Sequence, residues 1–119
     1  MPIAKTIASH LACEIHGPAG TSGDVTYASA TAHLALLFKE GRSIVAICAS
    51  GIVIRSLAPF LADKTLEPPV IAVAEDGSSV VPLLGGHHGA NMLAREIAAL
   101  VAGHAAITTA SDIRLDASL

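Results

Sequence analysis

The chain has almost no aromatic side chains and few charged ones. Aromatic residues make up 3% of its 119 residues, with no tryptophan and a single tyrosine, Tyr27. The formal net charge is −3, and no run of basic residues occurs anywhere in the sequence. Proteins that bind nucleic acids combine basic patches with aromatic side chains that stack on bases. The composition therefore argues against nucleic acid as a partner.

A hydrophobic run long enough to cross a membrane is also missing. The longest apolar stretch, 44–54, is interrupted by Ser50 and Gly51, whereas a membrane helix needs about 20 apolar residues. At the amino end only Lys5 precedes a weak apolar segment that polar residues interrupt, which makes a poor secretory signal. We therefore expect a cytoplasmic protein that makes no use of the membrane.

Cysteine is scarce too. Cys13 and Cys48 lie in apolar stretches and have neither CxxC spacing nor the Cys/His spacing of a metal site. We expect two buried free thiols and no metal ion bound by the chain.

Hydrophobic residues, by contrast, are abundant. They make up 52% of the chain, against 14% charged residues. A chain of this length and composition can bury an ordinary core as one domain, and no linker or repeat divides it. We expect a single domain over residues 1–119, with a flexible loop from Gly17 to Asp24.

The apolar pattern alternates between two periods. Continuous apolar runs predict strands covered on both faces at 44–49, 70–73, 80–84 and 106–109, with a further strand at 12–16. Helical periodicity predicts helices at 3–11, 31–40, 52–62 and 91–102. Gly41 and Gly103 follow two of these helices and are expected to close them in the left-handed conformation, while Pro59 should divide a third. This order predicts an α/β fold, a three-layer sandwich with a mostly parallel sheet and helices on both faces.

Two strand-to-helix turns are rich in small residues. One contains Ser50 and Gly51, with Arg55 about one turn into the helix, and the other is "PLLGGHHGAN", 82–91. In an open parallel sheet, ligands bind beyond the carboxyl ends of the strands, so both turns are expected at the same edge. Neither turn matches the GxGxxG or GxxxxGK[ST] pattern of nucleotide sites.

The second turn has two readings from its residues alone. Glycines in a turn most often supply a positive φ, and Asn91 is most simply a helix N-cap. The density of glycine beside histidine favours a ligand site, in which His87 could act as a general acid or base. A metal role for His87 and His88 is disfavoured, because adjacent side chains point apart and no third ligand lies nearby. The remaining histidines are expected at the surface or at helix caps: His10, His16, His33 and His104.

Four blocks of sequence, in order, carry a resemblance. They are Ser50-Gly51-Ile52 with Arg55 and Ala58-Pro59; Asp63-Lys64 with Glu67-Pro68; Gly86-His87-x-Gly89-Ala90-Asn91-x-Leu93-Ala94-Arg95; and Thr108-Thr109-Ala110-Ser111-Asp112. Together they resemble the amino-terminal domain of the CbiG family of cobalamin biosynthesis, the cobalt-precorrin-5A hydrolases. The chain departs from that pattern at Gly85, where the family usually has Ser, and at the extra His88. The family's hydrolases are longer chains with a second, carboxyl-terminal domain.

The resemblance implies that the chain opens the ring lactone of cobalt-precorrin-5A and releases acetaldehyde. His87 is then the candidate base, and the N–H groups of Gly86, Gly89 and Ala90 are the candidate oxyanion donors. The carboxylates of the tetrapyrrole would meet Arg55, Lys64 and the helix amino ends. The implied substrate-binding set is Ser50, Gly51, Arg55, Lys64, Gly86, Gly89, Ala90, Asn91, Thr108 and Thr109. No cofactor is expected, since the substrate carries the cobalt.

Three functions stay open on the sequence. The first is this hydrolase, and the second is a non-catalytic module that binds a corrin intermediate or docks onto a partner. That partner could be a second CbiG-like domain or another enzyme of the corrin pathway. Separately, the exposed edges expected of a small sheet make a homodimer plausible. The third, a nucleotide-binding α/β domain, depends on fold analogy alone.

Overall fold

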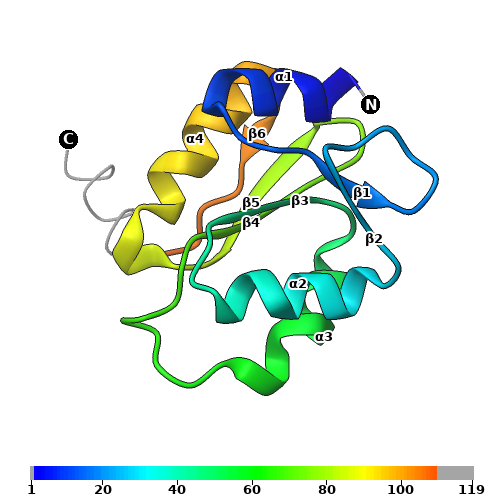
Figure 1. Cartoon of the computed structure of the whole chain (residues 1–119). Coiled ribbons are helices and arrows are strands. Elements are labelled where there is room, and N and C mark those ends of the chain that lie inside the picture. The colour runs from blue at the N-terminus through cyan, green and yellow to red at the C-terminus, as the bar shows by residue number, and fades with distance from the viewer. Residues whose placement is uncertain (1, 110–119) are drawn as a thin grey trace.

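A four-stranded sheet forms the centre of the structure, a computed structural model that describes residues 2–109 (Figure 1). Its strands are β3 (Ile44–Ile47), β4 (Val70–Val73), β5 (Ser79–Leu84) and β6 (His104–Ala105), in that spatial order. A separate pair, β1 (His16–Pro18) and β2 (Val25–Tyr27), forms a small parallel ribbon. The helices are α1 (Pro2–Leu11), α2 (Ala30–Lys39), α3 (Ser50–Leu57) and α4 (Ala90–Val101), with short 3-10 turns η1 (Ala58–Phe60) and η2 (Gly86–His88).

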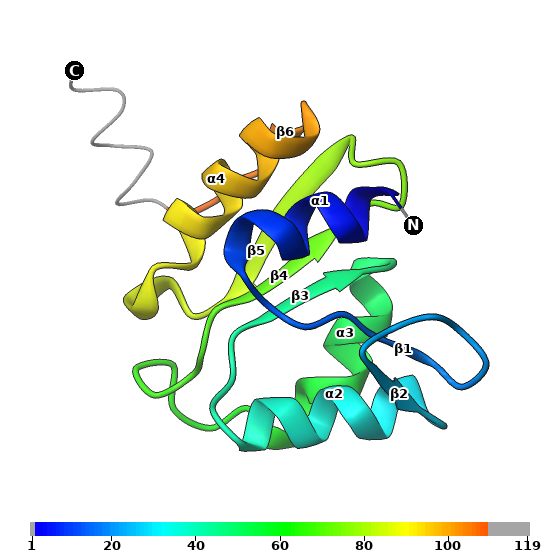
Figure 2. The same ribbon diagram turned by 45° about the horizontal axis from the view of Figure 1, so that its top comes forward.

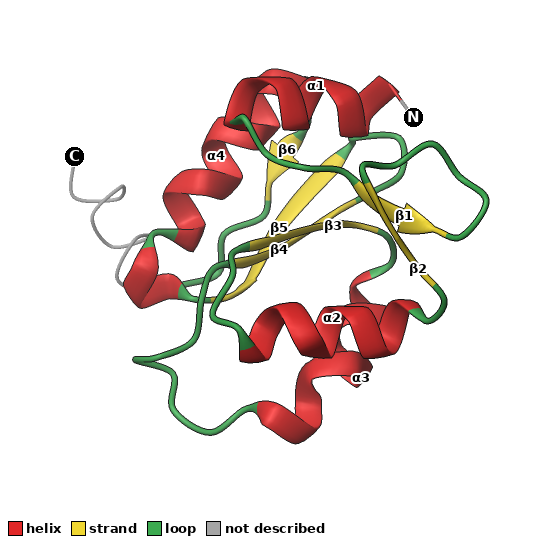
Figure 3. Cartoon of the chain, in the orientation of Figure 1, coloured by secondary structure: helices red, strands yellow, loops and turns green. Residues whose placement is uncertain are grey.

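Helices cover both faces of the sheet, as predicted (Figure 3). All four residues of β4 are buried, and successive side chains of a strand point to opposite faces. Ile71 belongs to the core cluster that contains Ile97 of α4. Val70 belongs to the cluster on the other face, which contains Leu57 of α3. The three-layer α/β sandwich is therefore confirmed.

The sheet is only partly parallel. β3 pairs with β4 and β5 with β6 in parallel, but β4 and β5 are antiparallel. The connection 74–78 is too short for the crossover that parallel neighbours require, about a dozen residues or more. It forms a tight turn in which Gly77 has a φ of 76° and the Asp76 carboxylate accepts hydrogen bonds from the side chain and N–H of Ser78. These hydrogen bonds lower the pKa of Asp76.

The amino-terminal third and β6 differ most from the prediction. Residues 12–15 of the predicted strand 12–16 form no strand. The first two residues of the expected loop Gly17–Asp24 belong to β1. Strand β2 is absent from the prediction, and β6 comes before the predicted strand at 106–109. These strands are very short and contain no apolar run that the sequence could reveal. They are strands because their backbones pair with a neighbour, as His104 of β6 pairs with Ser79 of β5.

One of the two predicted glycine caps is present. Gly41 has a φ of 75°, and the N–H of Arg42 donates to the Leu37 carbonyl to close α2. At the end of α4 the left-handed residue is Ala102, with a φ of 57°. Position 103 requires a glycine for a different reason. A Cβ there would lie 2.1 Å from the Gly77 carbonyl oxygen, so no larger residue fits.

The helix predicted at 52–62 is divided as Pro59 predicts, because α3 ends at Leu57 and η1 continues the chain. Within residues 2–109, no helix has the length and apolar character that a membrane span requires.

Candidate functional site

The two glycine-containing turns lie at opposite ends of the sheet. Ser50 follows the carboxyl end of β3, where Ile47 pairs with Val73. Gly85 follows the carboxyl end of β5, where Leu84 pairs with Val70 at the start of β4. The prediction of one shared edge is therefore wrong, because β5 runs antiparallel to β3 and β4. Figure 2 shows the start of α4 and the loop before β4 on one side, and the start of α3 on the other.

Several predicted site residues do gather at the carboxyl end of β5. Since β6 is parallel to β5, the segment that leaves it, with Thr108 and Thr109, emerges at this end. The side-chain amide of Asn91 donates a hydrogen bond of 3.1 Å to Thr109 Oγ1. Asn91 is therefore not the N-cap of α4, a position that Gly89 occupies. It lies in the first turn and connects that turn to the segment after β6.

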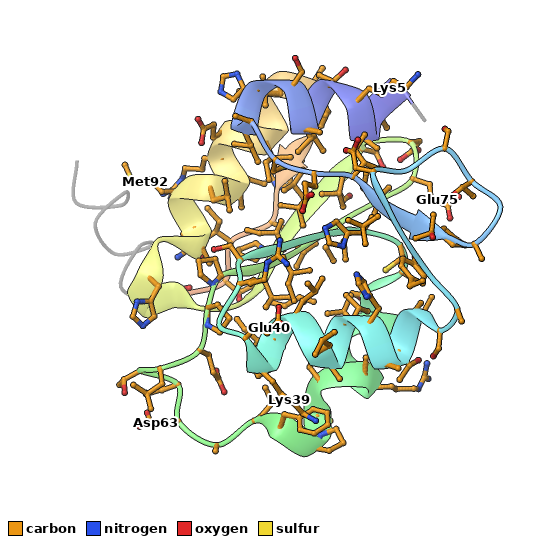
Figure 4. All side chains as sticks on the ribbon, in the orientation of Figure 1. Lys5, Lys39, Glu40, Asp63, Glu75 and Met92 are labelled. Carbon is orange, nitrogen blue, oxygen red and sulfur yellow. The ribbon has the colours of Figure 1, made fainter. Side chains whose placement is uncertain are left out.

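The loop 61–69 reaches the same end. The ring of His88 hydrogen-bonds through Nε2 to the carbonyl oxygen of Thr65, at 2.5 Å. The exposed Lys64 directly precedes Thr65 in this loop. Figure 4 shows Asp63 of the loop and Met92 of α4 on one side of the molecule and Glu75 on the opposite side. The histidine turn, the start of α4, the Lys64 loop and Thr109 thus belong to one end, which we call the β5-end site.

The backbone of the histidine turn is shaped by two glycines. Gly85 and Gly89 have φ values of 83° and 91°, so the expectation that these glycines supply positive φ is correct. A Cβ at Gly85 would also lie 2.5 Å from backbone atoms of Pro68 and Pro69. The glycine therefore lets the turn approach the end of the Lys64 loop closely.

One of the three predicted oxyanion donors is already used in a hydrogen bond within the turn. The N–H of Ala90 donates to the Gly85 carbonyl at 3.3 Å and is therefore engaged in the turn. Gly86 and Gly89 remain the candidate donors. A Cβ at Gly86 would have no neighbour within 4 Å, so this backbone borders open space.

His87 lies within η2, at the centre of the turn. Its side chain is outside the part of the molecule that the structure describes, and its catalytic role stays a prediction. Residues 110–112 of the fourth sequence block also lie outside the described residues.

The other end of the sheet holds Ser50, Gly51 and Arg55. A guanidinium nitrogen of Arg55 lies 3.4 Å from the position that a Cβ on Gly51 would take, so Arg55 folds over the start of its own helix. Cys48 is nearby in the chain and half-buried; burial, and then the charge of Glu75, raise the pKa of its thiol. These residues form a group separate from the β5-end site.

The sequence did not predict that two of the histidines form a pair. His16 of β1 and His33 of α2 are linked by a nitrogen-to-nitrogen hydrogen bond of 2.7 Å, and the Tyr27 ring stacks on His33 with centroids 4.8 Å apart. The sequence places these histidines at the surface or at caps, but they are half-buried. No local signal reports the pair, because α2 and the ribbon meet only in the folded chain.

Both cysteines are free, and the prediction that both are buried is wrong for Cys13, which is exposed. Among residues 2–109, no group of three or more histidine, cysteine, aspartate and glutamate side chains could hold a metal ion.

Comparison with known proteins gives a consistent set of similarities. The family described as "Cobalamin synthesis G N-terminal" matches residues 32–112. A cobalt-precorrin-5A hydrolase of Priestia megaterium is 42% identical over 79 residues, which cover 66% of this chain and 21% of that protein. The cobalt-precorrin-5A hydrolase of Salmonella typhimurium is 42% identical over 77 residues, 64% of this chain and 22% of that one. The chain thus spans about a fifth of the length of these curated relatives.

Among solved structures, a cobalamin biosynthesis protein G homolog from Sulfolobus solfataricus is similar, with a TM-score of 0.63 and 25% identity. The match covers 90% of this chain and 31% of that protein. The similarity therefore extends to the amino-terminal elements that precede the family match.

Proposed function

Because the chain belongs to the cobalamin synthesis G N-terminal family, we propose that it acts in cobalamin biosynthesis in the cytoplasm. Its proposed role is to bind cobalt-precorrin-5A and to open the lactone ring of that substrate with release of acetaldehyde. One observation carries the proposal: three of the sequence blocks that define the resemblance converge at the β5-end site. Asn91 contacts Thr109, and His88 contacts the loop that contains Lys64.

The chemistry of a lactone opening suits these groups. A base removes a proton from water, the water oxygen bonds to the acyl carbon, and the acyl C–O bond breaks to leave a carboxylate and an alcohol. The alcohol carbon then leaves as acetaldehyde when its bond to the macrocycle breaks and a proton replaces it there. His87 is the proposed base. The N–H groups of Gly86 and Gly89 are the proposed donors to the oxyanion.

Substrate binding is assigned to the groups of one end only. Lys64 and the amino end of α4 would receive carboxylates of the substrate, since both present positive charge or partial charge. Asn91, Thr108 and Thr109 supply neutral hydrogen-bonding groups beside them. Ser50, Gly51 and Arg55 lie at the other end of the sheet and are not part of this site. The chain would need no cofactor of its own, because the cobalt arrives with the substrate.

The direct test mixes the purified chain with cobalt-precorrin-5A and follows acetaldehyde together with the mass of the corrinoid. We expect acetaldehyde in proportion to protein, and its loss in His87→Ala. The matched control is His104→Ala, an exposed histidine of β6 that pairs at the opposite end of the sheet. Full activity in His87→Ala would overturn the role of His87.

A second function, a non-catalytic module, is favoured by one observation. The structure separates Arg55 from the β5-end site. In this case the protein would shift the absorption band of the corrinoid without releasing acetaldehyde. Release would then require a second CbiG-like domain or another enzyme of the pathway as partner.

A further inference from the structure

The loop 61–69 contains a preformed turn with exposed side chains. Asp63 Oδ1 accepts hydrogen bonds from the N–H of Thr65 at 2.9 Å and from its hydroxyl at 2.6 Å. The N–H of Leu66 donates to the Asp63 carbonyl at 3.0 Å. These hydrogen bonds determine the backbone shape of the turn that carries Lys64. They do not determine where the turn lies relative to the rest of the domain.

His88 supplies a connection between this turn and the body of the domain. Its Nε2 lies 2.5 Å from the Thr65 carbonyl oxygen, across 23 positions of sequence. A carbonyl oxygen only accepts hydrogen bonds, so Nε2 of His88 carries the hydrogen. Both the neutral ring with that tautomer and the imidazolium can donate, and the contact holds in either state. His88 is thus occupied in a structural contact and is not available at Nε2 as a base.

Two exposed groups of the turn match one class of ligand. Leu66 is 77% exposed, the highest value among the large hydrophobic residues described. Lys64 lies two positions before Leu66 and is exposed as well. Apolar side chains cover the face of a flat macrocycle, and an ammonium group pairs with a carboxylate at its edge.

We propose that His88 is a positioning residue, which holds the turn 63–66 against the histidine turn and so places Lys64 for a carboxylate of a macrocyclic polycarboxylate substrate. Leu66, in the same turn, contacts the apolar face of that substrate. The adjacent histidines then have different tasks: His87 is the proposed base, and His88 holds the loop. This inference rests on the proposed function for its ligand, but its hydrogen bond can be tested without any substrate.

Amide hydrogen exchange of the free protein tests the hydrogen bond. In His88→Ala we expect faster exchange of the amides of 63–67, because the turn loses its attachment. His88→Gln retains a donor at a similar distance from the backbone and should restore slow exchange. His104→Ala, at the other end of the sheet, should leave these amides unchanged. Unchanged exchange in His88→Ala would overturn the proposal whether or not the protein is an enzyme.

A double-mutant cycle tests the connection to substrate. Lys64→Met should raise KM, or Kd for the bound corrinoid, about tenfold with little change in kcat, as expected for one lost charge-assisted hydrogen bond. His88→Ala should raise the same constant several-fold and add nothing in the Lys64→Met background, because it acts through Lys64. Additive effects, or a fall in kcat at constant KM, would overturn the positioning role. If acetaldehyde never forms but the binding cycle gives this pattern, the catalytic function fails and the positioning role stands.

Discussion

Asn91 and Thr109 are joined by a hydrogen bond of 3.1 Å between the side-chain amide and the hydroxyl. The contact connects the first turn of α4 to the segment that follows β6. It brings together two residues from separate sequence blocks, and each is exposed or half-buried at the β5-end site.

Thr109→Val removes the acceptor while keeping the shape of the side chain. We expect a loss of about 0.5–1.5 kcal/mol in the free energy of unfolding, the usual contribution of one hydrogen bond. Urea denaturation measures it, and Thr108→Val, the exposed neighbour, is the control. If the two variants are equally stable, the Asn91 contact contributes nothing in solution.

Gly103→Ala should destabilise the domain by about 1–3 kcal/mol, in the range of overpacked sites. The added Cβ would lie 2.1 Å from the Gly77 carbonyl, so the end of α4 and the turn before β5 would have to separate. Gly86→Ala is the matched control, since its Cβ would meet no atom within 4 Å. We expect thermal unfolding of the control close to that of the natural protein. A Gly103→Ala protein as stable as the control would contradict this close approach.

His33→Ala should loosen the β1–β2 ribbon, because the change removes both the hydrogen bond to His16 and the ring stacked on Tyr27. Limited proteolysis within 17–24 should become several-fold faster, with cleavage sites read by mass spectrometry. His10→Ala is the control, since it breaks an exposed contact between α1 and Glu96 of α4 and leaves the histidine pair intact. Equal cleavage rates for the two variants would show that the histidine pair does not hold the ribbon.

The two thiols should react at different rates with iodoacetamide. Burial, with a smaller contribution from Glu75, raises the pKa of Cys48, and only the thiolate reacts. Cys13 is exposed and should be alkylated first, while Glu75→Gln should accelerate Cys48 modestly. Peptide mass spectrometry over time distinguishes the sites, and faster labelling of Cys48 would contradict the shift.

The raised pKa of Cys48 also has a consequence for stability. The folded protein keeps the thiol proton at a pH where the unfolded chain releases it. The free energy of unfolding should therefore decrease as the pH rises above the ordinary thiol pKa. Cys48→Ser should remove this part of the alkaline pH dependence, as urea denaturation across that range would measure.

Local and compositional signals in the sequence determined much of this protein. Runs such as 44–49 and 70–73 predict buried strands because continuous apolar side chains suit a sheet covered on both faces. Gly41 identifies the end of α2, since a left-handed residue without a side chain is favoured there. The sequence also contained the reason for the antiparallel pair: no helix fits between the strands ending at Val73 and starting at Ser79.

The tertiary structure decided which residues meet. The reversal of β5 places Gly85 and Ser50 at opposite ends of the sheet, although their turns look alike in the sequence. The contacts of His88 with Thr65 and of His16 with His33 join segments that are far apart in the sequence and lie together only in the folded chain. Local periodicity reports which side of an element faces the core, but the direction of a strand and the partners of a polar side chain are properties of the packed chain.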